Sequence, residues 1–144
     1  YPLDGWRKVE GGEYSMMWEI YPKGIYDLLT RIWKEYSPTC EIMITENGIP
    51  LSDTVDADGC VQDEMRIGYI KDHLTQIHLA MQSGVHVKGY FHWSFMDNFE
   101  WALGYTPRFG LVHIDYSTLQ RTMKESGRWF QRVIQANGFP RENG

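Results

Sequence analysis

The 144-residue chain contains little cysteine and no long apolar run. Cys40 and Cys60 have neither the spacing of a metal site nor the number needed for a disulfide framework, so we expect two free thiols in a reducing cytoplasm. No apolar stretch approaches the roughly 18 residues of a membrane-spanning helix, and no signal-peptide pattern is present. These absences argue against a disulfide-stabilised secreted protein and against a membrane protein.

Blocks of like charge are also absent. The chain has 14 Lys and Arg residues against 19 Asp and Glu residues, for a formal net charge of −5. Such a dispersed, mildly acidic balance argues against nucleic acid or an anionic membrane as the main partner. No glycine-rich phosphate loop occurs, the acidic loop around Asp56 lacks the pattern of a calcium loop, and the histidines lack the spacing of a metal site. The sequence therefore predicts no cofactor and no metal.

Aromatic side chains, in contrast, are abundant: six Trp, nine Tyr and six Phe, in a chain that is 42% apolar. This composition is typical of one globular domain with its own core. Aromatic residues fill cores, but they also line clefts that bind carbohydrate, so the enrichment only suggests a ligand class. Because the chain begins at Tyr1 without an initiator methionine, we expect a processed product or a piece of a larger protein.

Hydrophobic periodicity divides the chain into alternating helices and strands. Apolar residues at helical spacing follow Pro22, which suits the first turn of a helix, and Pro38 ends this pattern. A second helical pattern follows Asp63, a plausible N-cap, and ends at Gly84, while Gly138 would cap the last helix. The predicted elements are an irregular segment at 1–21, helices at 22–36, 63–84 and 123–137, strands at 41–45 and 85–93, and loops at 48–62 and 94–112.

The order helix, strand, helix, strand, helix predicts an α/β fold with parallel strands. Such units build either an open doubly wound sheet or a closed barrel. Two parallel strands alone form neither, since both sheet edges and half of the apolar helix faces would remain uncovered. We therefore expect the partner strands to lie outside this chain.

Candidate functional residues follow the two predicted strands, where sites of α/β folds lie. Glu46 directly follows the first strand, Trp93 ends the second, and Glu100 and Trp101 lie in the loop after it. Indole rings can stack on a sugar ring while carboxylates accept hydrogen bonds from its hydroxyls. Each residue also has an ordinary structural explanation, because a glutamate at a strand end is usually solvated or ion-paired and tryptophans often belong to the core.

Two motifs in combination favour the functional interpretation. The run from Ile44 to Gly48 (Ile-Thr-Glu-Asn-Gly) is followed about 45 residues later by the run 93–101 (Trp-Ser-Phe-Met-Asp-Asn-Phe-Glu-Trp) and then by Arg108, Phe109 and Gly110. Together they closely resemble glycoside hydrolase family 1, and the resemblance extends from Trp18 to Gly138.

This resemblance implies a fold and an activity. The family forms a (β/α)8 TIM barrel, and residues 1–144 resemble its C-terminal portion, comprising about strands 7–8 with helices 6–8. The implied activity is that of a retaining β-glycosidase, similar to a β-glucosidase, which hydrolyses terminal non-reducing β-D-glucosyl residues. Strands 1–6 would come from the N-terminal part of the same barrel, as a second chain or fragment.

The resemblance also implies roles for individual residues. Glu46 matches the catalytic nucleophile, Glu100 the residue that binds two sugar hydroxyls, and Trp101 the indole that donates to one of them. Trp93 matches the platform beneath the sugar ring, and Phe109 is expected near the same pocket. The side chains of 97 and 98 are expected to hold the loop that presents Glu100. Family members that act on 6-phosphorylated sugars differ in this region, so an unmodified β-glucoside, β-galactoside or β-fucoside is expected.

One part of the family's machinery is missing. A retaining glycosidase needs a second carboxyl group as acid and base, about 5–5.5 Å from the nucleophile. The family carries it in an Asn-Glu-Pro motif, which does not occur in these 144 residues. We therefore expect the isolated chain to be inactive. The alternatives are a non-catalytic sugar-binding or interaction module derived from the same barrel, and an oligomer of partial barrels, which would still lack the acid.

Overall fold

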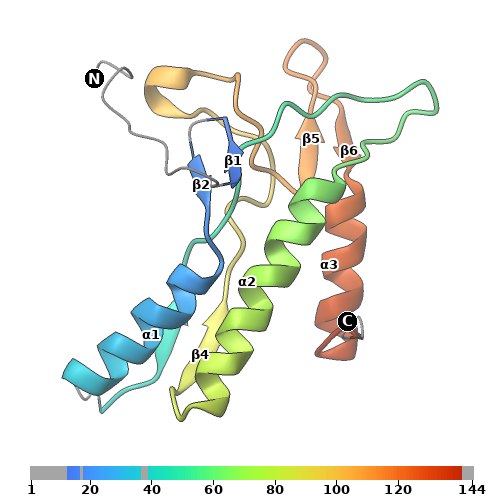
Figure 1. Ribbon diagram of the computed structural model, residues 1–144. Helices are drawn as coiled ribbons and strands as arrows, with labels where there is room; N and C mark the ends of the chain where they lie inside the picture. Colours follow the sequence, from blue (N-terminus) through green and yellow to red (C-terminus); the bar gives the residue numbers. More distant parts are fainter. Residues whose placement is uncertain (1–12, 17, 37–38, 141–144) are drawn as a thin grey trace.

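The computed structural model describes residues 13–16, 18–36 and 39–140 (Figure 1). Two parallel strands lie behind two of the three helices found in these ranges, and short hairpins and loops gather at the end to which the strands point. The elements are β1 (Glu13–Ser15), β2 (Trp18–Ile20), α1 (Lys23–Tyr36), β3 (Ile42–Ile44), α2 (Glu64–Gln82), β4 (Val87–Tyr90), the 3-10 turn η2 (Trp101–Leu103), β5 (Val112–Ile114), β6 (Arg121–Met123) and α3 (Glu125–Ala136).

A small apolar core joins the sheet to the first two helices. Leu29 of α1, Ile77 and Ala80 of α2, and Val85 before β4 are buried together, and side chains of β3 and β4 pack against them. Burying a Leu or Ile side chain contributes about 1.5–3 kcal/mol, so this cluster fixes how α1 and α2 cover the strands. α2 also packs against α3.

The three predicted helices and the parallel pairing are confirmed, but both strands are shorter than expected. β3 and β4 pair from Ile42 with Val87 to Ile44 with Tyr90, rather than over 41–45 and 85–93. Beyond Tyr90 the two segments still exchange hydrogen bonds outside the assigned strands: the N–H of Phe91 donates to the carbonyl of Ile44 and that of Trp93 to the carbonyl of Asn47, both at 2.9 Å.

Two antiparallel hairpins were missed by the sequence analysis. β1 pairs with β2 in the segment expected to be irregular, of which residues 1–12 lie outside the described part of the chain. β5 begins at Val112, the last residue of the predicted loop 94–112, and pairs with β6. Strands of three residues give too short an alternation for sequence periodicity to detect.

The helices end close to the predicted positions, but the residues and hydrogen bonds that cap them differ from the prediction. Asp63 precedes α2, yet its side chain makes no capping hydrogen bond; its carboxylate accepts instead from the N–H of Ser126 at 2.8 Å and from Arg66. At the end of α3, Asn137 rather than Gly138 takes the left-handed conformation, with φ of 49°. The N–H of Gly138 donates to the carbonyl of Val133 at 3.0 Å.

The sheet remains open on both sides. Within the described residues, β3 and β4 pair only with each other, and Met43 and Phe91 expose 50% and 54% of their surface. The expectation that these strands cannot close a sheet by themselves is therefore confirmed. In the same ranges, no helix is both long and apolar enough to cross a membrane.

Candidate active site

A cleft of about 490 Å³ lies where β3 and β4 end. All five site residues predicted from the sequence line this one cleft, contributed by the two strand ends and by the loop that follows β4. Four further lining residues were not predicted. The predicted residues are Glu46, Trp93, Glu100, Trp101 and Phe109, and the additional ones are Trp18, Asn47, Gly48 and Tyr69.

Glu46 lies two residues beyond β3 on an exposed and well-anchored turn. The side chain of the next residue, Asn47, accepts a hydrogen bond from the Tyr90 hydroxyl at 2.9 Å and donates one to the Tyr69 hydroxyl at 3.1 Å. Its carbonyl accepts from the N–H of Trp93 at 2.9 Å. The backbone that carries Glu46 is thus held by α2, by β4 and by the segment after β4.

Gly48 brings the two strand ends into close contact. A Cβ atom at this position would lie 1.7 Å from the carbonyl oxygen of Trp93, so any other residue would force the backbone apart. Trp93 exposes 37% of its surface and is not a core residue of the described chain. The Trp93–Ser94 peptide is cis, and the N–H of Ser94 donates to the carbonyl of Phe109 at 3.1 Å.

Glu100 and Trp101 occupy a tight turn at the top of the molecule in Figure 1, where η2 lies. The N–H of Glu100 donates to the carbonyl of Gly104 at 2.7 Å, and the N–H of Gly104 donates to that of Trp101 at 3.1 Å. Trp101 has φ of 41°, which is uncommon for a bulky residue, and 82% of its surface is exposed. The turn therefore presents this indole instead of packing it, and the interpretation of Trp101 as a core aromatic is wrong.

Phe109 and Trp18 close the side of the cleft next to the β1–β2 hairpin. Phe109 is buried, and its ring meets that of Trp18 edge-on with centroids 5.5 Å apart. No site role was predicted for Trp18 from the sequence, although the family resemblance begins there. The available signal was a tryptophan shortly before the first helix, which periodicity alone did not connect with the distant strand ends.

A group of buried charges includes two residues of the 94–112 loop, Asp97 and Arg108. We call it the ionic cluster, and within it Arg66, Lys124, Asp63 and Asp97 have fully buried side chains while Asp53 is almost fully buried. Its members are Asp53, Asp63, Arg66, Asp97, Arg108 and Lys124. Three formal positive charges meet three negative ones, so the cluster is neutral as a whole.

Asp97 is the member that connects this cluster to the loop. Its carboxylate accepts from the N–H of Gly110 at 2.9 Å and forms ion pairs with Lys124 at 2.8 Å and Arg108 at 3.2 Å. Asn98 donates to the Ser94 hydroxyl at 2.9 Å. Both side chains therefore hold the loop that presents Glu100, as the sequence analysis expected, but the rest of the ionic cluster was not foreseen.

Burial sets the protonation of several groups near the cleft. It raises the pKa of Tyr69 and, more strongly, that of Tyr90, so both phenols remain neutral hydrogen-bonding groups. It also lowers the pKa of Lys124, as does the positive charge of Arg66, while Asp53 and Asp97 oppose the change. Among the described residues, His, Cys, Asp and Glu side chains form no group of three that could hold a metal ion.

Comparison with known proteins gives a consistent result. The model of "Glycosyl hydrolase family 1" matches residues 6–139. The chain is 52% identical over 125 residues to β-glucosidase A of Thermotoga maritima, covering 87% of this chain and 28% of that protein. A solved structure of the family 1 β-glucosidase from T. maritima superimposes with a TM-score of 0.86 at 50% identity, covering 90% of this chain and 29% of that one.

A relative named for a different substrate has a similar sequence identity to this chain. The chain is 47% identical over 116 residues to a 6-phospho-β-galactosidase of Streptococcus equi subsp. zooepidemicus, covering 81% of this chain and 24% of that protein. Overall identity therefore does not separate neutral from phosphorylated sugars. The chain spans little more than a quarter of the length of the β-glucosidases it matches, so statements about substrate depend on the residues of the cleft.

Proposed function

Because the chain belongs to glycosyl hydrolase family 1 and has the fold of the C-terminal part of its (β/α)8 barrel, we propose that it supplies half of the catalytic site of a retaining β-glycosidase. One observation carries this proposal: Glu46, Trp93, Glu100, Trp101 and Phe109, which are separated by up to 63 positions in the sequence, line a single cleft.

The proposed chemistry has two steps. The Glu46 carboxylate attacks the anomeric carbon, the bond from that carbon to the leaving-group oxygen breaks, and a glycosyl-enzyme forms. A general acid gives its proton to the leaving oxygen and then, as a base, takes one from the water that releases the sugar. The Asn-Glu-Pro motif expected for this acid does not occur in the chain, so we assign the acid to strands 1–6, on a second chain or fragment.

The charge of the cleft supports a neutral substrate. Glu46 and Glu100 are acidic, and no Lys or Arg belongs to the described residues that line it. A 6-phosphate with nearly two negative charges would be repelled by two carboxylates without a compensating cation. We therefore propose a terminal β-D-glucosyl residue, or a β-galactosyl or β-fucosyl residue of the same uncharged class, with Glu100 and Trp101 on its hydroxyls and Trp93 beneath its ring.

The open sheet supports the proposed need for a partner. Free edges on β3 and β4 and the exposed side chains of Met43 and Phe91 would be covered by neighbouring strands and helices of a complete barrel. The isolated chain is then inactive because it has a nucleophile without its acid. Cys40 and Cys60 are both free thiols, and we retain a cytoplasmic location as a proposal.

The test is hydrolysis of 4-nitrophenyl β-D-glucoside by the chain alone and after completion with the N-terminal part of the same protein. We expect no turnover by the chain alone and full turnover after completion, with the 6-phosphorylated substrate turned over at least about 100-fold more slowly. Full turnover by the isolated, monomeric chain would contradict the need for a partner. Glucose binding without hydrolysis in the completed protein would instead establish the sugar-binding module.

A further inference from the structure

We propose that Asn47, clamped between Tyr69 and Tyr90, is a positioning residue that sets the aim of the Glu46 carboxylate. This inference rests on the proposed function, since it concerns how the nucleophile of that reaction is held. Asn47 also lines the cleft, but the inferred role is not contact with the sugar. Asn47 acts through the backbone it shares with Glu46.

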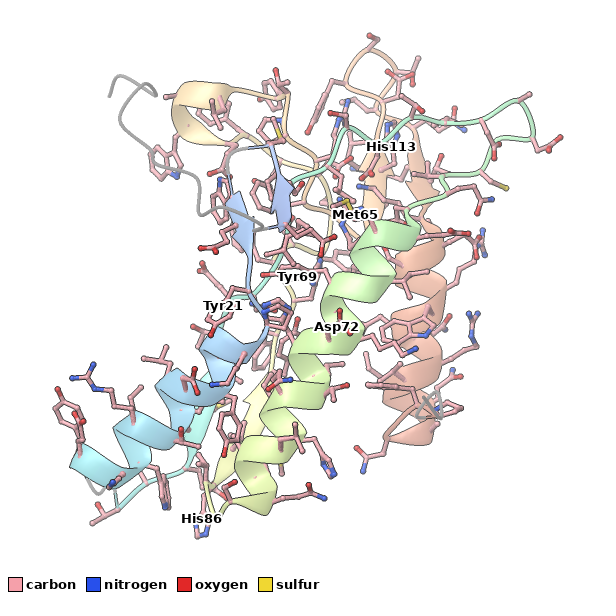
Figure 2. All side chains as sticks on the ribbon, viewed as in Figure 1. Tyr21, Met65, Tyr69, Asp72, His86 and His113 are labelled. Carbon is pink, nitrogen blue, oxygen red and sulfur yellow. The ribbon has the colours of Figure 1, made fainter. Side chains whose placement is uncertain are left out.

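The clamp joins three elements that are distant in sequence. Asn47 follows β3, Tyr69 lies in the first half of α2, and Tyr90 is the last residue of β4. The Asn47 amide uses both of its ends, with its oxygen 2.9 Å from the Tyr90 hydroxyl and its nitrogen 3.1 Å from the Tyr69 hydroxyl. Figure 2 shows Tyr69 leaving α2 towards the β1–β2 hairpin and the strand ends.

Each tyrosine is itself held by ring contacts. The ring of Tyr69 stacks on that of His73 with centroids 3.9 Å apart, and the ring of Tyr90 meets Phe130 of α3 edge-on at 6.1 Å. Both hydroxyls are partly buried and neutral, and a buried polar group without a partner is costly. Each hydroxyl therefore has a defined partner on the Asn47 side chain: the amide nitrogen for Tyr69 and the amide oxygen for Tyr90.

Within the described part of the chain, the place of Glu46 is set through its backbone, because its side chain has no partner there. The residue is exposed, and its carboxylate makes no hydrogen bond or ion pair with any described residue. Its place relative to Trp93 is set by the turn, through the Asn47 side chain and the hydrogen bond from the Trp93 N–H to the Asn47 carbonyl. Covalent attack requires the reacting atoms to be aligned closely, so a small rotation of this turn slows the reaction more than it weakens sugar binding.

The experiment uses the completed enzyme and separates attack from binding. Attack is measured as the rate of glycosyl-enzyme formation on Glu46 with 2,4-dinitrophenyl 2-deoxy-2-fluoro-β-D-glucoside, followed by intact mass. Binding is measured as the inhibition constant of glucose. We expect Asn47→Ala to slow glycosyl-enzyme formation by about 100-fold, and Tyr69→Phe and Tyr90→Phe to slow it by about 10-fold each. The inhibition constant should change by less than about 3-fold, because Glu100, Trp93 and Trp101 are untouched.

A double-mutant cycle measures whether the effects of Tyr90→Phe and Asn47→Ala on the rate are coupled, which distinguishes positioning through Asn47 from independent structural effects. If the hydroxyls act through Asn47, then adding Tyr90→Phe to Asn47→Ala causes no further loss. The matched control is Tyr26→Phe, which removes a hydroxyl that contacts the Ser83 hydroxyl at 3.2 Å, away from the cleft, and should leave the rate unchanged. Thermal unfolding of every variant reports whether the fold is intact, and the two Tyr→Phe variants suffice if Asn47→Ala does not fold.

The inference is overturned if folded Tyr69→Phe and Tyr90→Phe enzymes form the glycosyl-enzyme at the wild-type rate. It is also overturned if rate and inhibition constant worsen together, or if the two losses add fully in the Asn47→Ala background. Failure of the proposed function would give a different experimental result. The completed wild-type enzyme would then form no glycosyl-enzyme at all, before any variant is compared.

Discussion

The ionic cluster and the β3–β4 sheet differ in how far this chain completes them by itself. In the ionic cluster, charges from the 48–62 loop, α2, the 94–112 loop and the segment before α3 are buried and paired within the chain. In the sheet, two strands pair only with each other among the described residues, and several apolar side chains next to them are exposed. The two regions meet at the cleft, where one presents Glu100 and the other Glu46.

This difference assigns separate tasks to the two regions. Removing one partner of a buried ion pair is strongly destabilising, and Asp97 and Arg108 of the ionic cluster lie on either side of the turn that carries Glu100 and Trp101. An open sheet edge pairs readily with another strand, and under the proposed function that strand would belong to the N-terminal part of the barrel. Changes in the first region should therefore alter stability, and changes at the end of β3 should alter the reaction.

The largest expected effect is on activity alone. In the completed enzyme, Glu46→Gln should lower kcat by about 10⁴-fold or more, because the amide cannot form the glycosyl-enzyme, while the unfolding temperature stays unchanged. The measurement is hydrolysis of 4-nitrophenyl β-D-glucoside together with thermal unfolding. The matched control is Glu41→Gln, at the other end of the same strand, where an exposed carboxylate pairs with Lys88 at 3.3 Å; near-normal activity of Glu46→Gln would refute the assignment of the nucleophile.

The next effect should fall on stability. Asp97→Ala removes the carboxylate shared by Lys124 and Arg108, and leaving buried charge uncompensated costs about 3–5 kcal/mol. Urea unfolding of the chain and of the completed enzyme measures this loss. Asp27→Ala, which breaks the exposed pair with Lys23, is the control and should change stability little. Equal losses of unfolding free energy in the two variants would contradict the prediction that the buried ion pairs contribute more to stability than an exposed one.

A pH effect should connect the two regions through His92, just beyond β4. Burial lowers its pKa from 6.5 to about 4, and the positive charges of Arg66 and Lys124 add to this, against the Phe109 carbonyl and Asp63. As the pH falls, His92 therefore takes up a proton at a higher pH in the unfolded chain than in the folded one. The stability from neutral His92 is fully present above pH 6.5 and is lost as pH falls towards 4, by on the order of 3 kcal/mol.

Unfolding free energies at pH 7 and pH 4.5 in wild type and His92→Gln measure this contribution. The variant keeps a donor for the Phe109 carbonyl, which His92 contacts at 3.3 Å, but cannot take up a proton. Since carboxylates also titrate in this range, the relevant quantity is the difference between the two proteins. An equal loss of stability on acidification in both proteins would contradict the assignment.

The smallest effect should be a gain. Gly68 lies inside α2 with nothing within 4 Å of an added Cβ, so Gly68→Ala should stabilise the chain by about 0.5–1 kcal/mol. The matched change is Gly127→Ala in α3, where a Cβ would lie 2.6 Å from the Met123 sulfur and 2.8 Å from the Leu111 carbonyl. The packing around Gly127 leaves no room for a methyl group, so Gly127→Ala is expected to destabilise the chain. Urea midpoints of both variants give the comparison, and a gain at Gly127 would show that the region is looser than described.

The sequence predicted what depends on periodicity and on long motifs. The helices were found because apolar residues recur at helical spacing, such as Leu28, Leu29 and Ile32 in one and Ile70, Leu74 and Ile77 in the next. The five cleft residues were found because they stand in recognisable runs. The cluster around Arg66 and Lys124 was not found, because an arginine inside a predicted helix and a lysine before another are indistinguishable from surface charges until the fold brings Asp53, Asp63 and Asp97 to them. Trp18 and Tyr69 were missed for the same reason: their role in the cleft arises from tertiary contact.

The contact between Gly48 and the Trp93 carbonyl has a consequence for protein engineering. Since even a methyl group at position 48 would collide with that backbone oxygen, the turn that bears Glu46 and the segment that bears the Trp93 indole can only be transplanted as a pair. A designer who grafts this half-site onto another barrel, or exchanges loops between family members to alter specificity, must cut outside both segments. A junction placed between them would combine two backbones that were never fitted to each other.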